Sequence, residues 1–157
     1  MNLAAPPLVG VEWVVEAFDC DPDRLRDRAK LQDLCDRLLK ELDLHALGMT
    51  QWHTFPYPGG VTGLYLLTES HLACHTYPEH ALATFNLYCC RPRSRWPWEK
   101  RLIEALGAER VIVRSLERGN AAEPNPPTPF PKREGGVGPT SPLFLGEGSP
   151  RLTEACQ

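Results

Sequence analysis

The chain has 157 residues, of which 42% are hydrophobic and 24% charged, and its formal net charge is −3. This is the composition of an ordinary globular protein, and its slight negative charge gives no electrostatic basis for binding nucleic acid. No apolar run is long enough to cross a bilayer, and residues 1–10 lack the basic region and apolar core of a secretory signal. We therefore expect a cytoplasmic protein that binds neither nucleic acid nor membrane.

The elements expected in residues 1–119 follow in the order strand, helix, four strands, helix and strand. Alternating apolar and polar residues predict the strands, and leucines at helical spacing predict the helices. The expected strands are residues 8–18, 45–55, 61–68, 71–77, 82–90 and 111–116. The first helix follows the start signal at Asp21-Pro22-Asp23 and runs to Leu42, and the second runs from Pro97 to Leu106.

Two helices on a mostly antiparallel sheet make an α+β fold, a two-layer sandwich. The sheet face without helices needs a cover, and a homodimer that packs sheet against sheet, or helix layer against helix layer, is a natural solution. Residues 120–157 are rich in Pro and Gly and lack an apolar period. We therefore predict one domain in residues 1–119, followed by a disordered tail.

One serine, three histidines, a thiol and two carboxylates lie in the thirteen residues from Thr68 to His80. These residues could simply be polar groups at a sheet edge. A metal site could use His71, Cys74 and His75 with Cys89 or Cys90, but their spacing matches no closed zinc motif and strand alternation separates Cys74 from both histidines. A hydrolytic Ser-His-Glu triad is a further alternative, although no G-x-S-x-G elbow precedes a helix here.

The same segment resembles the processing site of the prokaryotic-type S-adenosylmethionine decarboxylases. The similarity is carried by Gly60-Val61-Thr62-Gly63, by Leu66 to His71 and by His75 to Glu79, with a cysteine twenty residues after the serine. It extends over residues 10–119, from the first strand to Glu117-Arg118-Gly119. It implies the α+β sandwich of that family and a proenzyme that cleaves itself.

The resemblance implies that Ser70 attacks the carbonyl of Glu69 and that β-elimination then leaves a pyruvoyl group at residue 70. The products would be a β chain of residues 1–69 and an α chain that begins at residue 70. His75 matches the proton acceptor of processing, Thr62 a supporting hydroxyl, and Cys90 the proton donor of turnover. The pyruvoyl ketone, which forms a Schiff base with the substrate amine, is the implied cofactor, and no metal is implied.

The implied reaction converts S-adenosylmethionine to its decarboxylated form, the aminopropyl donor for spermidine, and CO2. Phe55 and Tyr77 would stack on adenine or face the sulfonium, and Glu79 would face the substrate. The family usually has Trp at Tyr77, Asp at Asn86 and Gly at Arg91. These departures leave open a decarboxylase of ornithine or arginine, and a further alternative is a binding paralogue that does not process itself.

Overall fold

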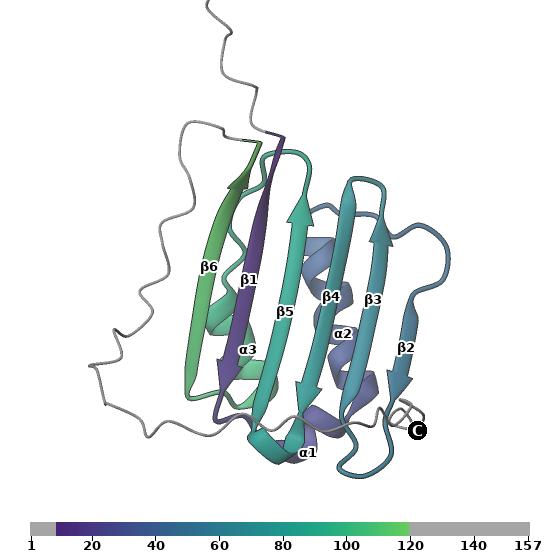
Figure 1. The fold of residues 1–157 in the computed structure, drawn as a ribbon, viewed down its shortest axis with the longest axis vertical. Helices are drawn as coiled ribbons and strands as arrows, with labels where there is room; N and C mark the ends of the chain where they lie inside the picture. Colours follow the sequence, from purple (N-terminus) through teal and green to yellow (C-terminus); the bar gives the residue numbers. More distant parts are fainter. Residues whose placement is uncertain (1–8, 120–157) are drawn as a thin grey trace, which may run out of the picture. The chain divides into compact units, whose positions relative to one another are not determined.

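A computed structural model of the chain describes residues 9–119. Their strands form one antiparallel sheet in the order β2-β3-β4-β5-β1-β6 (Figure 1). The strands are β1 (Gly10–Phe18), β2 (Gln51–Thr54), β3 (Val61–Leu67), β4 (Ser70–Tyr77), β5 (Leu82–Cys89) and β6 (Arg110–Arg118). The α+β fold class and the six strands are confirmed. The expected tail, residues 120–157, and Leu8 lie outside the described residues.

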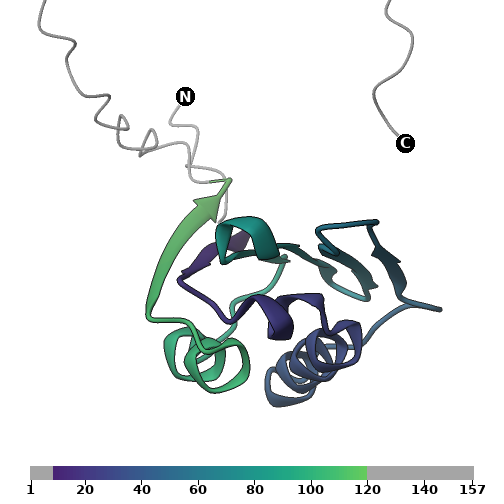
Figure 2. The same cartoon turned by 90° about the horizontal axis from the view of Figure 1, so that it is seen from below.

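The helices of residues 9–119 are α1 (Pro22–Arg26), α2 (Arg28–Glu41) and α3 (Trp98–Leu106), with a 3₁₀ turn η1 (Pro78–His80). Figure 2 shows that α2 and α3 lie side by side on one face of the sheet. We call the opposite face the open face, because no helix of the described residues covers it (Figures 1 and 2). In the same residues, no helix is both long and apolar enough to span a membrane.

The prediction of a single first helix is wrong, because Asp27 divides this stretch into α1 and α2. Asp27 has extended backbone angles, and its side chain accepts a hydrogen bond from the Lys30 N–H at 3.0 Å. An aspartate at a helix N-cap satisfies amides that have no intrahelical partner, so a new helix starts there. The leucine stripe nevertheless faces the core across the break: Leu25, Leu31, Leu34, Leu38 and Leu39 are all buried.

The expected strand 45–55 is also too long. Only Ala46 forms a bridge, to Leu67, before Gly48 turns the chain with a φ of +68°, and β2 begins at Gln51. Trp52 then packs edge-on against Tyr65, with ring centroids 5.8 Å apart. Gly63 makes this possible, because a Cβ at that position would lie 2.6 Å from the Trp52 ring. A large aromatic residue therefore anchors a short edge strand whose other residues are exposed.

Strand β5 follows the predicted alternation along its whole length. Ala83, Phe85, Leu87 and Cys89 are buried under the helices, while the residues between them are partly exposed on the open face. Phe85 contacts Trp98 of α3, with ring centroids 5.9 Å apart. Burial of these apolar side chains therefore holds the helix layer to the sheet. The residues at the alternate positions of the strand face the open side.

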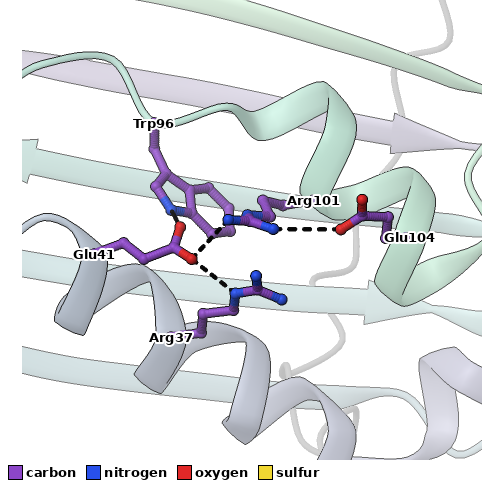
Figure 3. A network of polar contacts seen from close by, with 5 residues as sticks. All are labelled: Arg37, Glu41, Trp96, Arg101 and Glu104. Carbon is purple, nitrogen blue, oxygen red and sulfur yellow. Dashed lines mark hydrogen bonds and ion pairs between the residues drawn. The ribbon is translucent and has the colours of Figure 1, made fainter.

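A polar network joins the two long helices (Figure 3). Glu41, at the end of α2, accepts hydrogen bonds from the indole N–H of Trp96 at 2.7 Å, from Arg37 at 2.8 Å and from Arg101 of α3 at 2.7 Å. The hydrogen bond from Arg37, followed by those from Trp96 and Arg101, lowers the pKa of the Glu41 carboxyl below its ordinary value. The ionised carboxylate is therefore the form that stabilises the helix layer.

We predict that Glu41→Gln lowers the free energy of unfolding by about 1–2 kcal/mol at pH 7, because a neutral amide replaces an acceptor of charged donors. A carboxyl whose pKa is lowered on folding stabilises the fold above its unfolded pKa, and this contribution is lost as pH falls through the folded pKa. The difference between wild type and variant should therefore shrink below about pH 4.5. Urea unfolding at pH 7 and in acid measures it. Glu104→Gln, at a more exposed carboxylate 3.4 Å from Arg101, is the control and should change stability little. Equal losses in the two variants would contradict the role of Glu41.

Candidate active site

The bond between Glu69 and Ser70 lies where β3 turns into β4. Leu67 pairs with Ser70, so that Thr68 and Glu69 form a two-residue turn. The hydroxyl oxygen of Ser70 lies directly against the carbonyl oxygen of Glu69, and the φ of Ser70 is +157°. The tight turn therefore places a β-hydroxyl next to the carbonyl group of the preceding residue. An N-to-O acyl shift needs this hydroxyl to turn from the carbonyl oxygen to the carbonyl carbon.

The backbone amide of Cys90 binds both of these oxygens. Its N–H lies 3.1 Å from the carbonyl oxygen of Glu69 and 3.1 Å from Oγ of Ser70. Pairing between β4 and β5 sets Ser70 opposite Cys89, which brings the next residue to the turn. An N–H at this position polarises the carbonyl and can stabilise an oxyanion on it. The sequence predicted a role for the thiol of Cys90 but missed this role of its amide.

The two adjacent cysteines occupy different environments. Cys89 is fully buried on the helix side, and burial raises the pKa of its thiol to about 11. Cys90 is exposed. This confirms the predicted orientation of the pair, and it leaves Cys90 as the thiol that solutes can reach.

The side chain of Glu69 is held by the segment that follows β5. Only 15% of this side chain is exposed, and its Oε1 lies 2.7 Å from Arg93 and 3.8 Å from Arg91. The hydrogen bond to Glu69 raises the pKa of the Arg93 guanidinium. Sequence reasoning missed Arg93, although the basic pair in Arg91-Pro92-Arg93 directly follows the cysteine.

A second group of predicted residues lies at the other end of the same strands. Thr62 pairs with His75, and their side chains are joined by a hydrogen bond of 2.9 Å between Oγ1 and Nδ1. His53 pairs with Thr62 on the other side, and its ring meets that of Phe55 edge-on at 4.5 Å. Tyr77, at the end of β4, is 38% exposed.

These two groups, which we call the scissile group (Glu69, Ser70, Cys90) and the histidine group (Phe55, Thr62, His75, Tyr77, Glu79), are far apart within one chain. Ser70 and His75 are five residue steps apart along an extended strand, a span of roughly 16 Å. The side chain of His75 therefore cannot reach the Ser70 hydroxyl of its own chain. The scissile group therefore has the serine but no histidine of the predicted set, and the histidine group has His75 but no scissile bond.

The residues of the alternative metal site are also separated. Cys74 is buried under the helices, whereas His71 and His75 of the same strand are exposed on the open face. Cys89 is buried as well, at the far end of β5. A hydrolytic triad finds no suitable histidine on β4. His75 lies at the opposite end of the strand from Ser70, and the Nε2 of His71 is engaged by Asn86 at 3.1 Å.

Asn86, one of the departures from the family pattern, lies at the centre of a network on the open face. Its side-chain oxygen is 3.1 Å from Nε2 of His71, and its amide donates to Glu12 at 2.7 Å. Arg118 pairs with the same carboxylate. The hydrogen bond from Asn86, aided by Arg118, lowers the pKa of Glu12. An aspartate could not donate to Glu12, so the amide suits this network.

Comparison with known proteins assigns this geometry to a family. The family model described as S-adenosylmethionine decarboxylase matches residues 11–119. The chain belongs to the S-adenosylmethionine decarboxylase family. The members of this family are pyruvoyl-dependent decarboxylases made as proenzymes, so the chain is a decarboxylase proenzyme of this type.

Relatives and a solved structure of the S-adenosylmethionine decarboxylase family agree with this placement. The S-adenosylmethionine decarboxylase proenzyme of Parasynechococcus marenigrum is 34% identical over 116 residues, which are 73% of this chain and 89% of the relative. The crystal structure of the adenosylmethionine decarboxylase from Aquifex aeolicus has a TM-score of 0.60 at 28% identity and covers 76% of this chain and 98% of its own.

One relative carries another substrate in its name. The arginine decarboxylase proenzyme of Ignicoccus hospitalis is 29% identical over 119 residues, which are 74% of this chain and 82% of the relative. At this identity, membership of the S-adenosylmethionine decarboxylase family defines the reaction class of the chain but does not define its substrate.

Proposed function

We propose that this chain cleaves itself between Glu69 and Ser70 and then decarboxylates S-adenosylmethionine. One observation carries the proposal: the Ser70 hydroxyl lies against the Glu69 carbonyl, and the Cys90 amide donates to both oxygens. The expected setting is the cytoplasm, where the product would supply the aminopropyl group for spermidine.

Self-cleavage uses two neighbouring groups, the Ser70 hydroxyl and the Glu69 carbonyl. Oγ of Ser70 adds to the carbonyl carbon of Glu69, the C–N bond breaks, and the nitrogen of residue 70 takes a proton, which gives an ester. A base then removes the α-proton of residue 70, and the Cβ–Oγ bond breaks. The oxygen and the electron pair leave with Glu69 as its new α-carboxylate. The dehydroalanine left behind takes up water and loses ammonia to become the pyruvoyl group. The Cys90 amide stabilises the oxyanion of the first step.

The base in this scheme is His75 of the partner subunit. Within one chain, about 16 Å separate Ser70 from His75, so a second copy is needed to complete the site. The open face supports such a dimer, because Leu64 and Leu66 are 48% and 63% exposed there. Two open faces packed about a twofold axis with opposed strand directions would set the histidine group of one chain over the scissile group of the other. Thr62 would hold the imidazole in place.

This arrangement predicts complementation. His75→Ala and Ser70→Ala should each stay uncut when expressed alone. When the two are co-expressed, up to about half of the His75→Ala chains should be cut, because a mixed dimer supplies His75 from the Ser70→Ala partner. Mass spectrometry identifies the cut fragment that carries the His75→Ala substitution.

The control for complementation is His80→Ala, at an exposed histidine of the 3₁₀ turn, which should be cut as fast as wild type. Cleavage of His75→Ala by itself would remove His75 as the base. No cleavage in the mixture would mean that His75 does not act across a dimer.

In turnover, the pyruvoyl group would supply a carbonyl that binds the substrate amine and takes up the electrons left by CO2. The Cys90 thiol then returns a proton to the α-carbon, since it is exposed beside residue 70. Phe55, 51% exposed, and Tyr77 present aromatic faces suited to adenine or to a sulfonium cation, and the exposed Glu79 adds negative charge. These three residues belong to the histidine group, so the substrate would lie between the two chains.

CO2 release from S-adenosylmethionine, ornithine and arginine, measured in parallel on cleaved protein, tests the substrate. We expect S-adenosylmethionine to be the best substrate, because the histidine group contains two exposed aromatic residues and only one carboxylate, Glu79. A higher kcat/KM with arginine would assign the chain to the activity named for its Ignicoccus relative. Cleaved protein that releases CO2 from none of the three compounds would contradict S-adenosylmethionine, ornithine and arginine alike as substrates.

A further inference from the structure

The segment after β5 places two arginines at the side chain of Glu69, the residue before the scissile bond. Arg93 and Arg91 both lie at Oε1 of Glu69, at 2.7 and 3.8 Å. Before cleavage, two guanidinium groups thus face one carboxylate. Arg91 is 74% exposed and is held only loosely, so most of its five N–H donors remain available.

The pair of Glu69 and Arg93 is mostly shielded from water. Their side chains are 15% and 22% exposed. Oε2 of Glu69 and Nε of Arg93 are buried and have no hydrogen-bond partner among the described residues. A partly desolvated pair of this kind amplifies electrostatic effects on any charge that forms beside it.

Self-cleavage forms such a charge. When the Cβ–Oγ bond of residue 70 breaks, its electron pair stays on oxygen, and Glu69 leaves with a new α-carboxylate. The two oxygens of this carboxylate are the former carbonyl oxygen of Glu69 and the former Oγ of Ser70. They are the two atoms that lie 3.1 Å from the Cys90 amide before the reaction. The leaving group therefore forms at an N–H donor, on the residue whose side chain already contacts two guanidinium groups.

We propose that Arg91 and Arg93 form a carboxylate site that receives the α-carboxylate of Glu69 and speeds the elimination step. This inference rests on the self-cleavage proposed above. After the reaction, two carboxylates of Glu69 would share these two guanidinium groups, one of which, Arg93, also feels the charge of Asp43. Arg93 positions Glu69 through its side chain, and Arg91 supplies the free cation. The new end of the β chain stays bound beside residue 70.

The test follows the ester that precedes elimination. Hydroxylamine under denaturing conditions splits an ester but not an amide, and it yields a β chain with a hydroxamate end and an α chain that still begins with serine. Arg91→Met should slow pyruvoyl formation roughly three- to tenfold, and Arg93→Met roughly ten- to hundredfold, with accumulation of hydroxylamine-sensitive precursor in both. Arg93→Lys, which keeps the charge, should recover part of the rate. Arg95→Met, which removes an exposed arginine paired with Glu99, is the control and should match wild type.

Salt separates an electrostatic role from a structural one. Going from about 20 mM to about 500 mM salt should slow elimination in wild type but hardly in Arg91→Met, because an exposed charge is screened. The proposal is overturned if both Met variants form pyruvoyl at the wild-type rate. It is also overturned if their precursor resists hydroxylamine and the variants melt at a lower temperature, because the arginines would then have a structural role before the ester forms. A wild-type chain that never cleaves would instead contradict the proposed function itself.

Discussion

Ser70→Ala is expected to give a single uncut chain of 157 residues without decarboxylase activity. The β-oxygen attacks the Glu69 carbonyl and then leaves from Cβ, and alanine has no group that could do either, so removal of Oγ abolishes both steps. Intact-mass analysis of the purified protein measures the outcome, with wild type expected as two fragments that meet at residues 69 and 70.

The loss in Ser70→Ala should not come from unfolding. The substitution removes one oxygen at a partly exposed strand end and leaves the pairing of β4 with β3 and β5 in place. The melting temperature should therefore stay close to that of uncut wild type. Ser94→Ala, at an exposed serine, is the matched control and should be cut normally. A Ser70→Ala chain that still splits at this bond would refute the mechanism.

Cys90→Ala is expected to separate processing from turnover. The backbone amide that holds the Glu69 carbonyl and Ser70 Oγ remains in the variant, so the chain should still be cut. Loss of the thiol removes the proton donor, which should lower kcat by roughly 100- to 10,000-fold. Intact mass reports the cleavage, and CO2 release reports the turnover of the same sample.

Cys90→Ser is the control for size and polarity in this experiment. Its hydroxyl is a much weaker acid than a thiol, so turnover should stay low although the side chain still fits. Full activity in Cys90→Ala would move the proton donor to another residue. Failure of that variant to cleave would mean that the thiol, and not only the amide, takes part in processing.

The fold could largely be predicted from local patterns. Alternation in 82–90 predicted the two faces of β5, and the buried positions of that strand confirm it. The errors lie where a single residue outweighs the pattern. Asp27 caps a new helix inside a continuous leucine stripe, and Gly48 interrupts a stretch rich in strand-forming residues. Both errors concern local turns, which hydrophobic periodicity does not describe.

The sequence by itself determined the chemistry at one bond, because the order Glu69-Ser70 places a hydroxyl next to a carbonyl in any fold. It also determined that Cys89 and Cys90 point to opposite faces, since successive residues of a strand alternate. Only the tertiary structure brought Cys90 and Arg93 to Glu69, through strand pairing across twenty or more residues. The same extended strand that aligns these groups moves His75 away from Ser70, because each residue of a strand advances about 3.3 Å.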